Sequence, residues 1–322
     1  TGFTGTAPNT NLLTVSPANV GLALEVGQSL TISFNLTFYP NFANAPFTNQ
    51  ATATGDEPDG GGDGDGTVDN SGNGDANDTS TNGTDPDDDN DGTTETSDTD
   101  NNPSENTPTP VNPTLTPRIG AAKQAGTVTP NGNGTFTVPF TMTLENFGNV
   151  PLYDVQVTDS LSAEFGTYQA TAATVDAAGE YTVDDPVVTD TTPTPALVAN
   201  TNFTGSGGNT GLFTVSSTAA LEVGRTVTVV FNLTFYPNPA TATVSGSTLT
   251  FNNAATASGD SPDAGGDGNG TADGSTTDTS TNGTDPDDDN DGTVETSDTD
   301  NNPNESVSTP IAVTMDPVIG IA

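Results

Sequence analysis

Residues 221–237 read LEVGRTVTVVFNLTFYP, and from position 226 the side chains alternate between polar and apolar. The apolar parity comprises Val227, Val229, Phe231, Leu233 and Phe235, whereas the other parity is mostly Thr and Asn. Successive side chains of a strand point to opposite faces of a sheet, so the pattern predicts a half-buried strand. Segment 135–161 alternates in the same way and places Phe140, Met142 and Leu144, then Val155 and Val157, on the inner face.

Short turn signals separate these segments, such as NGNG at 131–134 and NFGN at 146–149. No window has convincing helical periodicity, and Thr, Val, Asn, Gly and Pro dominate. We therefore predict an all-β fold, built as antiparallel sandwiches with one solvated face per sheet.

The composition narrows the range of functions. Among 322 residues, 43 are acidic and 3 are basic, which gives a net charge of −40, and there is no His or Cys. Such a charge repels nucleic acid and anionic membranes, and the sequence has no apolar run long enough to span a membrane. Without His or Cys no nucleophile has an evident base, so we expect no enzyme. Carboxylate oxygen, the abundant ligand type, suits calcium.

An internal repeat of about 200 residues organises the chain. LEVGQSLTISFNLTFYP at 24–40 matches 221–237 at 12 of 17 positions, and RIGAA at 118–122 returns as VIGIA at 318–322. We predict that 1–118 is the later part of one module, that 119–318 is a complete module, and that 319–322 begins the next. A small insertion is expected in the second copy near TVSGSTLTF.

Three segments in succession carry a resemblance to a known family: TFTVPFTMTLENFGNVPLYDVQVTDSL (135–161), LEVGRTVTVVFNLTFYP (221–237) and LTFNNAATASGDSP (249–262). Their order resembles that of the immunoglobulin-like conserved repeat domain of giant tandem-repeat prokaryotic surface proteins. The resemblance covers nearly all of 119–318 and implies Ig-like modules in tandem within a surface stalk or adhesin. It also implies a last strand within NESVSTPIAVTM (304–315). The chain departs from the family by a long acidic insertion before that strand.

Each module carries an acidic loop, at about 56–105 and 260–305, and these two ranges hold 31 of the 43 acidic residues. Segments 79–103 and 279–303 match at 24 of 25 positions, more closely than the strands do. Within them the spacing follows the calcium loop D-x-[DN]-x-[DN]-G-x5-E, with Asp at the last position. The predicted calcium ligands are Asp87, Asp89, Asp91, Thr93, Glu95 and Asp98, and Asp287, Asp289, Asp291, Thr293, Glu295 and Asp298.

Pro86 and Pro103 exclude the helices of an EF-hand, so these would be bare loops, as in thrombospondin type 3 repeats. A disordered, solubilising tract is the alternative that Asp, Asn, Gly and Thr composition normally predicts. Satellite calcium positions, weighed against a flexible linker, are Asp63, Asp65, Asp100, Asp267, Asn269 and Asp300.

Lys123 is the only lysine. An intramolecular Lys–Asn or Lys–Asp isopeptide bond, as in other surface sandwiches, is one interpretation, but an ordinary surface lysine is the expected one.

The sequence thus predicts a structural segment of an extracellular, cell-surface fibre or adhesin stalk, stiffened by calcium. Its expected partners are neighbouring modules of the same or identical chains, with surface glycans as a further candidate. One alternative is an S-layer or filament subunit that assembles by strand donation between chains, because Phe34, Leu36 and Phe38 lack an opposing strand within 1–118. A carbohydrate-binding or glycoside-processing module is a second alternative.

Overall fold

The structure is a computed structural model. It describes residues 3–13, 24–38, 46–55, 76–84, 86, 107–189, 196–262, 275–286 and 306–315. The chain divides into two compact units, Thr1–Pro113 and Thr114–Ala322. Residues 114–118 belong to the second unit because they bind its 146–149 turn. The Thr116 amide donates to Asn149 Oδ1 at 2.7 Å, and Asn149 Nδ2 donates to the Thr114 carbonyl at 2.8 Å.

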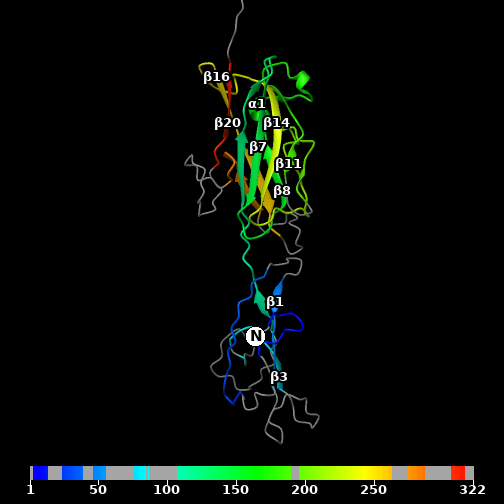
Figure 1. The fold of residues 1–322 in the computed structure, drawn as a ribbon, viewed down its shortest axis with the longest axis vertical. Helices are drawn as coiled ribbons and strands as arrows, with labels where there is room; N and C mark the ends of the chain where they lie inside the picture. The colour runs from blue at the N-terminus through cyan, green and yellow to red at the C-terminus, as the bar shows by residue number, and fades with distance from the viewer. Residues whose placement is uncertain are drawn as a thin grey trace, which may run out of the picture. The chain divides into compact units, whose positions relative to one another are not determined.

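The larger sheet of the second unit has the strand order β19-β5-β7-β14-β10-β9, with β6 pairing β7 and β11 pairing β14. Its centre is the antiparallel pair β7 and β14, in register from Phe136↔Phe235 to Glu145↔Thr226 (Figure 1). The strands are β5 (Ile119–Ala125), β6 (Thr129–Pro130), β7 (Phe136–Asn146), β9 (Thr167–Tyr168), β10 (Glu180–Val183), β11 (Val187–Thr189), β14 (Thr226–Tyr236) and β19 (Thr281–Asn282).

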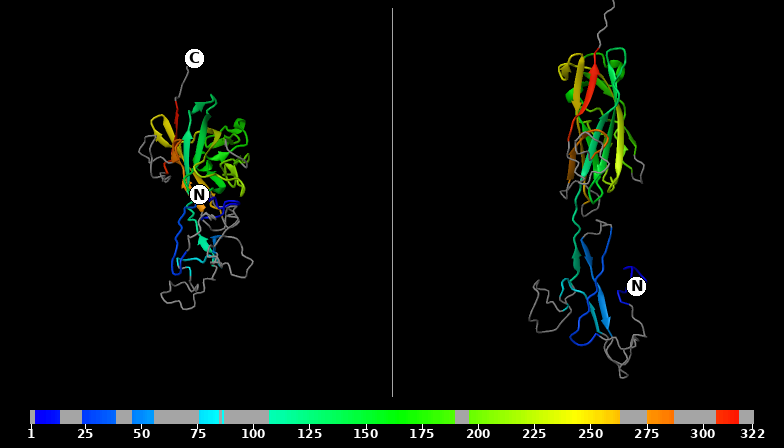
Figure 2. Two further views of the ribbon diagram at one scale, coloured as in Figure 1. Left: turned by 60° about the horizontal axis from the view of Figure 1, so that its bottom comes forward. Right: turned by 60° about the vertical axis from the view of Figure 1, so that its left-hand side comes forward.

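Two three-stranded sheets form the opposing layer, in the orders β15-β16-β20 and β18-β17-β8. Only Ala254 separates β16 from β17, so one stretch of chain passes from the first of these sheets to the second. Figure 2 shows β20, in red, beside β16. The strands are β8 (Tyr153–Asp159), β15 (Thr243–Ser245), β16 (Thr248–Asn253), β17 (Ala255–Asp260), β18 (Ser275–Thr279) and β20 (Thr309–Thr314). A short pair, β12 (Val198–Ala199) and β13 (Phe213–Thr214), forms a separate two-stranded sheet.

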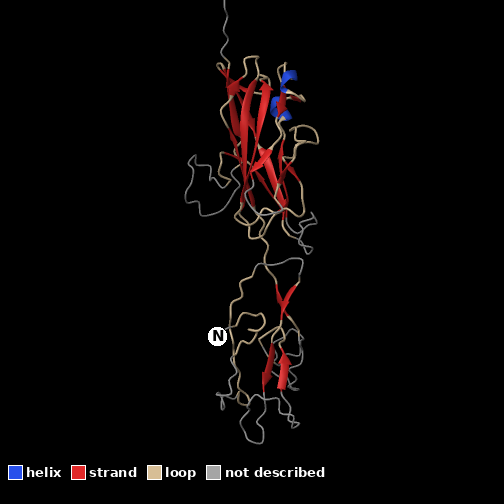
Figure 3. Cartoon of the chain, turned by 45° about the vertical axis from the view of Figure 1, so that its right-hand side comes forward, coloured by secondary structure: helices blue, strands red, loops and turns tan. Residues whose placement is uncertain are grey.

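The two layers share one apolar core. The ring centroids of Phe235, on β14, and Phe251, on β16, lie 5.4 Å apart. Every residue that the alternation of 135–161 and 221–237 predicts to face inward is at most 3% exposed. Among the described residues, helix is limited to α1 (Ser162–Phe165) and the 3-10 turn η3 (Ala172–Thr174), drawn in blue in Figure 3. The all-β prediction is therefore confirmed, and the unit has the character of a β-sandwich.

Two smaller expectations also have a structural counterpart. The insertion near TVSGSTLTF forms the hairpin of β15 and β16, whose turn uses Gly246 at φ 62°. The segment 304–315 contains β20, whose side chains alternate between buried and exposed.

The described residues of the first unit form four short strands, paired as β1-β4 and β2-β3: β1 (Phe47–Asn49), β2 (Thr52–Gly55), β3 (Ala76–Thr79) and β4 (Thr109–Val111). These pairs reproduce pairs of the second unit. Asn49↔Thr109 has its equivalent in Asn253↔Thr309, and Ala53↔Asp78 in Ala257↔Asp278.

The contacts beside these strands also repeat. In the first unit the Ala51 amide donates to Ser80 Oγ at 2.9 Å, and the Ser80 amide donates to the Ala51 carbonyl at 2.8 Å. The second unit has the same two bonds between Ala255 and Ser280, at 3.0 and 2.8 Å. The local hairpin geometry is thus present in both units.

Residues 24–38 do not form a strand, although they share the alternation of 221–237. Phe34, Leu36 and Phe38 are 51%, 65% and 40% exposed. The physical reason is that 24–38 has no neighbouring strand, within the described part of the chain, with which to form backbone hydrogen bonds. In the second unit β14 lies between β7 and β10, whereas among the described residues of 1–113 no strand pairs with 24–38. A strand without neighbours has unsatisfied backbone groups and gains no ladder bonds.

Candidate functional site

Three polar residues occupy inward positions on three strands of the second unit. On β5, Lys123 follows the buried Ile119 and Ala121 at the same parity. On β8, Asp159 continues the inner face of Val155 and Val157. Because side chains of one parity share a face, these residues point into the core rather than to solvent.

The third residue, Asn253, continues the inner face of Leu249 and Phe251 on β16. Asp159 pairs with Ala255, two positions beyond Asn253, so Asn253 and Asp159 are diagonal neighbours. The lysine reaches them from the opposing sheet. We call Lys123, Asp159 and Asn253 the lysine centre.

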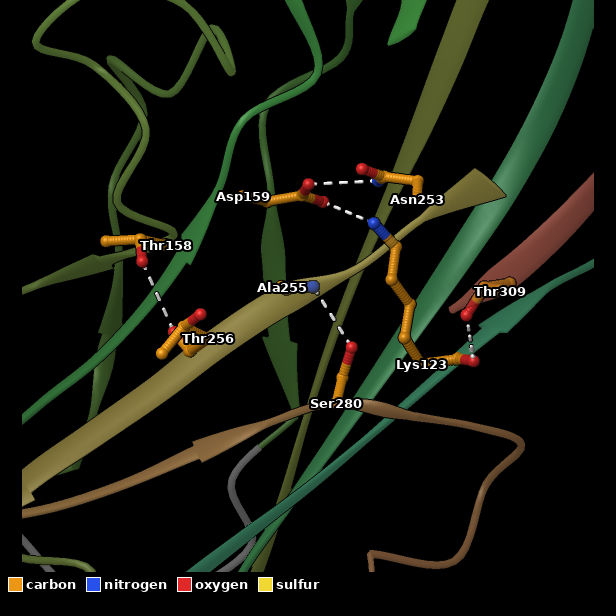
Figure 4. A network of polar contacts seen from close by, with 8 residues as sticks. All are labelled: Lys123, Thr158, Asp159, Asn253, Ala255, Thr256, Ser280 and Thr309. Carbon is orange, nitrogen blue, oxygen red and sulfur yellow. Dashed lines mark hydrogen bonds and ion pairs between the residues drawn. The ribbon is translucent and has the colours of Figure 1, made fainter. Parts of the chain in front are cut away.

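One carboxylate connects all three side chains of the lysine centre. Lys123 Nζ donates to Asp159 Oδ2 at 2.5 Å, and Asn253 Nδ2 donates to Asp159 Oδ1 at 2.9 Å. Figure 4 shows the three side chains converging, with the amine facing both the carboxylate and the carboxamide. Since the two acceptor oxygens belong to one carboxylate, the amine and the carboxamide lie next to each other.

Solvent is excluded from the lysine centre. Lys123 and Asp159 are 0% exposed and Asn253 is 3% exposed. The Phe140 ring lies against the amine, with 4.4 Å from Nζ to the ring centroid. Burial lowers the pKa of Lys123, because a charged amine loses its hydration there, whereas the charge and hydrogen bond of Asp159 act in the opposite direction.

A buried phenol lies nearby on β10. Burial raises the pKa of Tyr181, and the negative charge of Asp159 adds to this rise. Tyr181 donates its hydroxyl proton to the Thr204 carbonyl at 2.9 Å. The phenol therefore stays neutral.

The backbone of Lys123 binds the chain on both sides of the predicted calcium segment 287–298. Its carbonyl accepts from the Gly283 amide at 3.0 Å and from Thr309 Oγ1 at 2.7 Å. Gly283 precedes the predicted calcium segment 287–298, and Thr309 follows it. The loop is therefore closed at its base on the residue whose side chain enters the lysine centre.

The outer edge of β5 is covered by side chains of β18. Asp278 Oδ2 accepts from the Ala121 amide at 2.8 Å, and Thr276 Oγ1 accepts from the Ile119 amide at 3.3 Å. Further along, β19 pairs with β5 in parallel at Ala122 and Lys123. These contacts hold Lys123 on a fixed strand.

All residues of the predicted calcium loops, 87–98 and 287–298, and all the satellite positions lie outside the described residues. Within the described parts of the chain, no group of three or more acidic side chains is placed to hold a metal ion.

The expectation of a surface position for Lys123 is wrong. The prediction followed the general rarity of buried lysine. The sequence held a local signal for burial, because Lys123 continues the alternate positions of the buried Ile119 and Ala121 on β5. The same signal, a polar residue at the next inward position, marks Asp159 and Asn253.

No family model and no curated protein matches the chain. Among solved structures, one similar chain is the biomass-sensing module of an Rsgi2 protein of Clostridium thermocellum, described as resembling a family 3 carbohydrate-binding module of the cellulosome. The identity is 18%, the TM-score is 0.21, and the match covers 37% of this chain and 66%, just under two thirds, of that one. A TM-score this low carries no argument about fold or function.

In the described part of the chain, no helix is long and apolar enough to cross a membrane.

Proposed function

We propose that the chain is a structural segment of an extracellular fibre or adhesin stalk, made of tandem Ig-like β-sandwich modules that calcium stiffens. The observation that carries this proposal is the repeated register of the two units. The Ala53↔Asp78 pair and the Ala257↔Asp278 pair, with their flanking Ser–Ala bonds, occupy equivalent places in the sequence repeat. Repetition of one module favours a spacer whose length is set by copy number.

Calcium enters this proposal through the closed base of the acidic loop. With Gly283 and Thr309 both bound to the Lys123 carbonyl, the ends of the loop are already held together. Gly83 and Gly283 share the unusual φ values of 154° and 148° just before the two loops. A closed loop brings carboxylates near one another, and at about 5 Å each pair repels by roughly 1 to 3 kcal/mol. A bound cation removes that repulsion.

The metal test uses limited proteolysis with calcium and with a chelator. We expect chelation to speed cleavage within 287–305 and to leave the strands intact, because only the loop depends on the ion. Asp289→Ala should weaken calcium affinity at least about tenfold, whereas Asp288→Ala, at a position without a ligand role, should change it by less than about twofold. Equal cleavage in both conditions would exclude the metal site.

The exposed apolar residues of 24–38 favour one alternative, a filament subunit that receives a strand from another chain. Seven of them are large and at least 40% exposed: Leu24, Val26, Leu30, Ile32, Phe34, Leu36 and Phe38. Exposed apolar surface next to unpaired backbone is a site for strand addition.

Light scattering after size-exclusion chromatography distinguishes a stalk segment from a filament subunit. A strand-donating subunit forms chains whose mass grows with concentration, and Phe34→Asp should abolish this growth. A stalk segment stays monomeric, with or without the substitution.

A further inference from the structure

The lysine centre contains the three groups that an internal amide bond requires. It holds an amine, a carboxamide and a carboxyl group, all three side chains almost fully shielded from solvent. We propose that Lys123 Nζ and the side-chain carbonyl carbon of Asn253 become joined by an isopeptide bond, with Asp159 carrying the proton. This inference does not depend on calcium or on the fibre.

Geometry supplies the first argument. Asp159 accepts from the amine at 2.5 Å and from the carboxamide at 2.9 Å, and thus holds the two reacting groups side by side. Each group comes from a different strand, and each strand is fixed by its ladder bonds. Groups held in this way react as though at effective concentrations of about 10⁵ M or more, which makes an otherwise very slow aminolysis feasible.

Electrostatics supplies the second argument. An ammonium ion is no nucleophile, so the lysine must lose a proton before it reacts. The buried site favours that loss, because desolvation lowers the pKa of Lys123. The proton passes to Asp159 Oδ2, and the pair becomes a neutral amine and a neutral carboxylic acid.

The reaction is balanced in atoms and charge. The neutral amine attacks the Asn253 carbonyl carbon, a C–N bond forms, and the attacking nitrogen gives up one proton. Asp159 transfers one proton to the Asn253 amide nitrogen, whose bond to carbon breaks, and ammonia leaves. The products are a secondary amide, one ammonia molecule and Asp159 as a carboxylic acid. No oxidant, reductant or cofactor is required.

The low net stability of the buried Lys123–Asp159 ion pair explains why bond formation is favoured in the lysine centre. A buried ion pair gives little net stability, because the loss of hydration offsets the attraction. Conversion to an amide and a protonated acid removes both charges from the core, and the ammonia escapes into solvent. The only lysine of the chain occupies this core position, where a simple ion pair would contribute little.

The intact mass of the purified 322-residue chain tests the proposal without any variant. We expect a mass lower than the sequence mass by one ammonia molecule. Trypsin after denaturation gives an independent readout, since the cationic residues are Arg118, Lys123 and Arg225. An unmodified chain releases the peptide 119–123, whereas the cross-linked chain gives 119–225 joined to 226–322. A full sequence mass together with the free peptide 119–123 overturns the proposal.

Variants then assign the roles. Lys123→Met and Asn253→Ala should retain the full mass of their own sequences, whereas Asn252→Ala, at the exposed neighbouring position, should still lose ammonia. Asn253→Asp should lose water instead and reach the same final mass as the wild type. This substitution keeps the shape of the site, so a folding failure is not expected to obscure the result.

The role of Asp159 is tested by its isosteric amide. Asp159→Asn should keep the β-sheet circular dichroism signal but slow the loss of ammonia by at least about a hundredfold, because it cannot accept the proton. Cross-linking at the wild-type rate in this variant would overturn the assignment of Asp159 as proton carrier.

Discussion

At the scale of single residues, the lysine centre shows how a core position can hold a charged side chain. Lys123 is buried because its place on β5 is an inward one, and Asp159 compensates its charge from the facing layer. Removing one member of such a pair leaves the other charge buried without a partner, which costs about 3 to 5 kcal/mol. The pair is thus coupled even where no covalent bond can form.

Two variants that cannot form the bond isolate this coupling. We expect Lys123→Met to have a lower free energy of unfolding than the double variant Lys123→Met/Asp159→Asn, because the single variant leaves the Asp159 carboxylate without a cation. The double variant Lys123→Met/Asp159→Asn should recover about 3 kcal/mol, since it replaces the charge with a neutral group that still accepts from Asn253. Urea unfolding of the two proteins measures the difference. Equal stability would mean that Asp159 carries no buried charge in the single variant.

The lysine centre also shows how much of the core the sequence alone predicts. The alternation identified the apolar core residues of β7, β8 and β14 directly. The same parity continues into Lys123, Asp159 and Asn253, but it does not show that three strands from two layers bring them together. That meeting depends on layer packing, which follows from contacts far apart in the sequence.

At the scale of elements, the edge of β5 illustrates how the module protects an open strand. Instead of a full neighbouring strand, the side chains of Asp278 and Thr276 accept the Ala121 and Ile119 amide protons. An unpaired edge would otherwise offer its amides to another chain. Side-chain acceptors therefore replace part of a ladder.

Substitution of the buried acceptor tests this function. We expect Asp278→Ala to destabilise the second unit by about 1 to 3 kcal/mol, because it leaves the Ala121 amide without its acceptor. Asp278→Asn keeps an oxygen at the same place and should cost less. Thr277→Ala, at the exposed position between the two acceptors, should change stability by less than about 0.5 kcal/mol. Hydrogen exchange at Ala121 should accelerate in Asp278→Ala alone, and unchanged protection there would contradict the role.

A comparison of β14 with the segment 24–38 shows that alternation of polar and apolar residues alone does not predict a strand. Both share the alternation, yet only 226–236 forms a strand, with β7 and β10 as neighbours. Periodicity states which face of a strand is apolar, but ladder bonds come from other segments. For the acidic loops, the sequence predicts the spacing of the calcium ligands. The predicted ligands lie outside the described residues, so the calcium site stays a prediction.

At the scale of the whole molecule, the isopeptide bond would change how the module carries tension. Force along the chain enters the second unit at β5 and leaves it after β20. Without the bond, unfolding extends every residue between them. A bond from Lys123 to Asn253 transfers the load directly from β5 to β16, so the segment 124–252 is bypassed. A module built in this way resists stretching even after its remaining strands separate.

Single-molecule stretching of the 322-residue chain, held at its two ends, measures this bypass. We expect the second unit of Lys123→Met to extend further than that of the wild type by about 450 Å, because the segment 124–252 is released at about 3.5 Å per residue. Asn252→Ala should keep the short wild-type extension, since it retains both reacting groups. The bypass depends on a covalent bond rather than on fold stability, so denaturant should leave the difference unchanged. Equal extension of the wild type and Lys123→Met would show that tension passes through 124–252 and that no covalent bond closes the module.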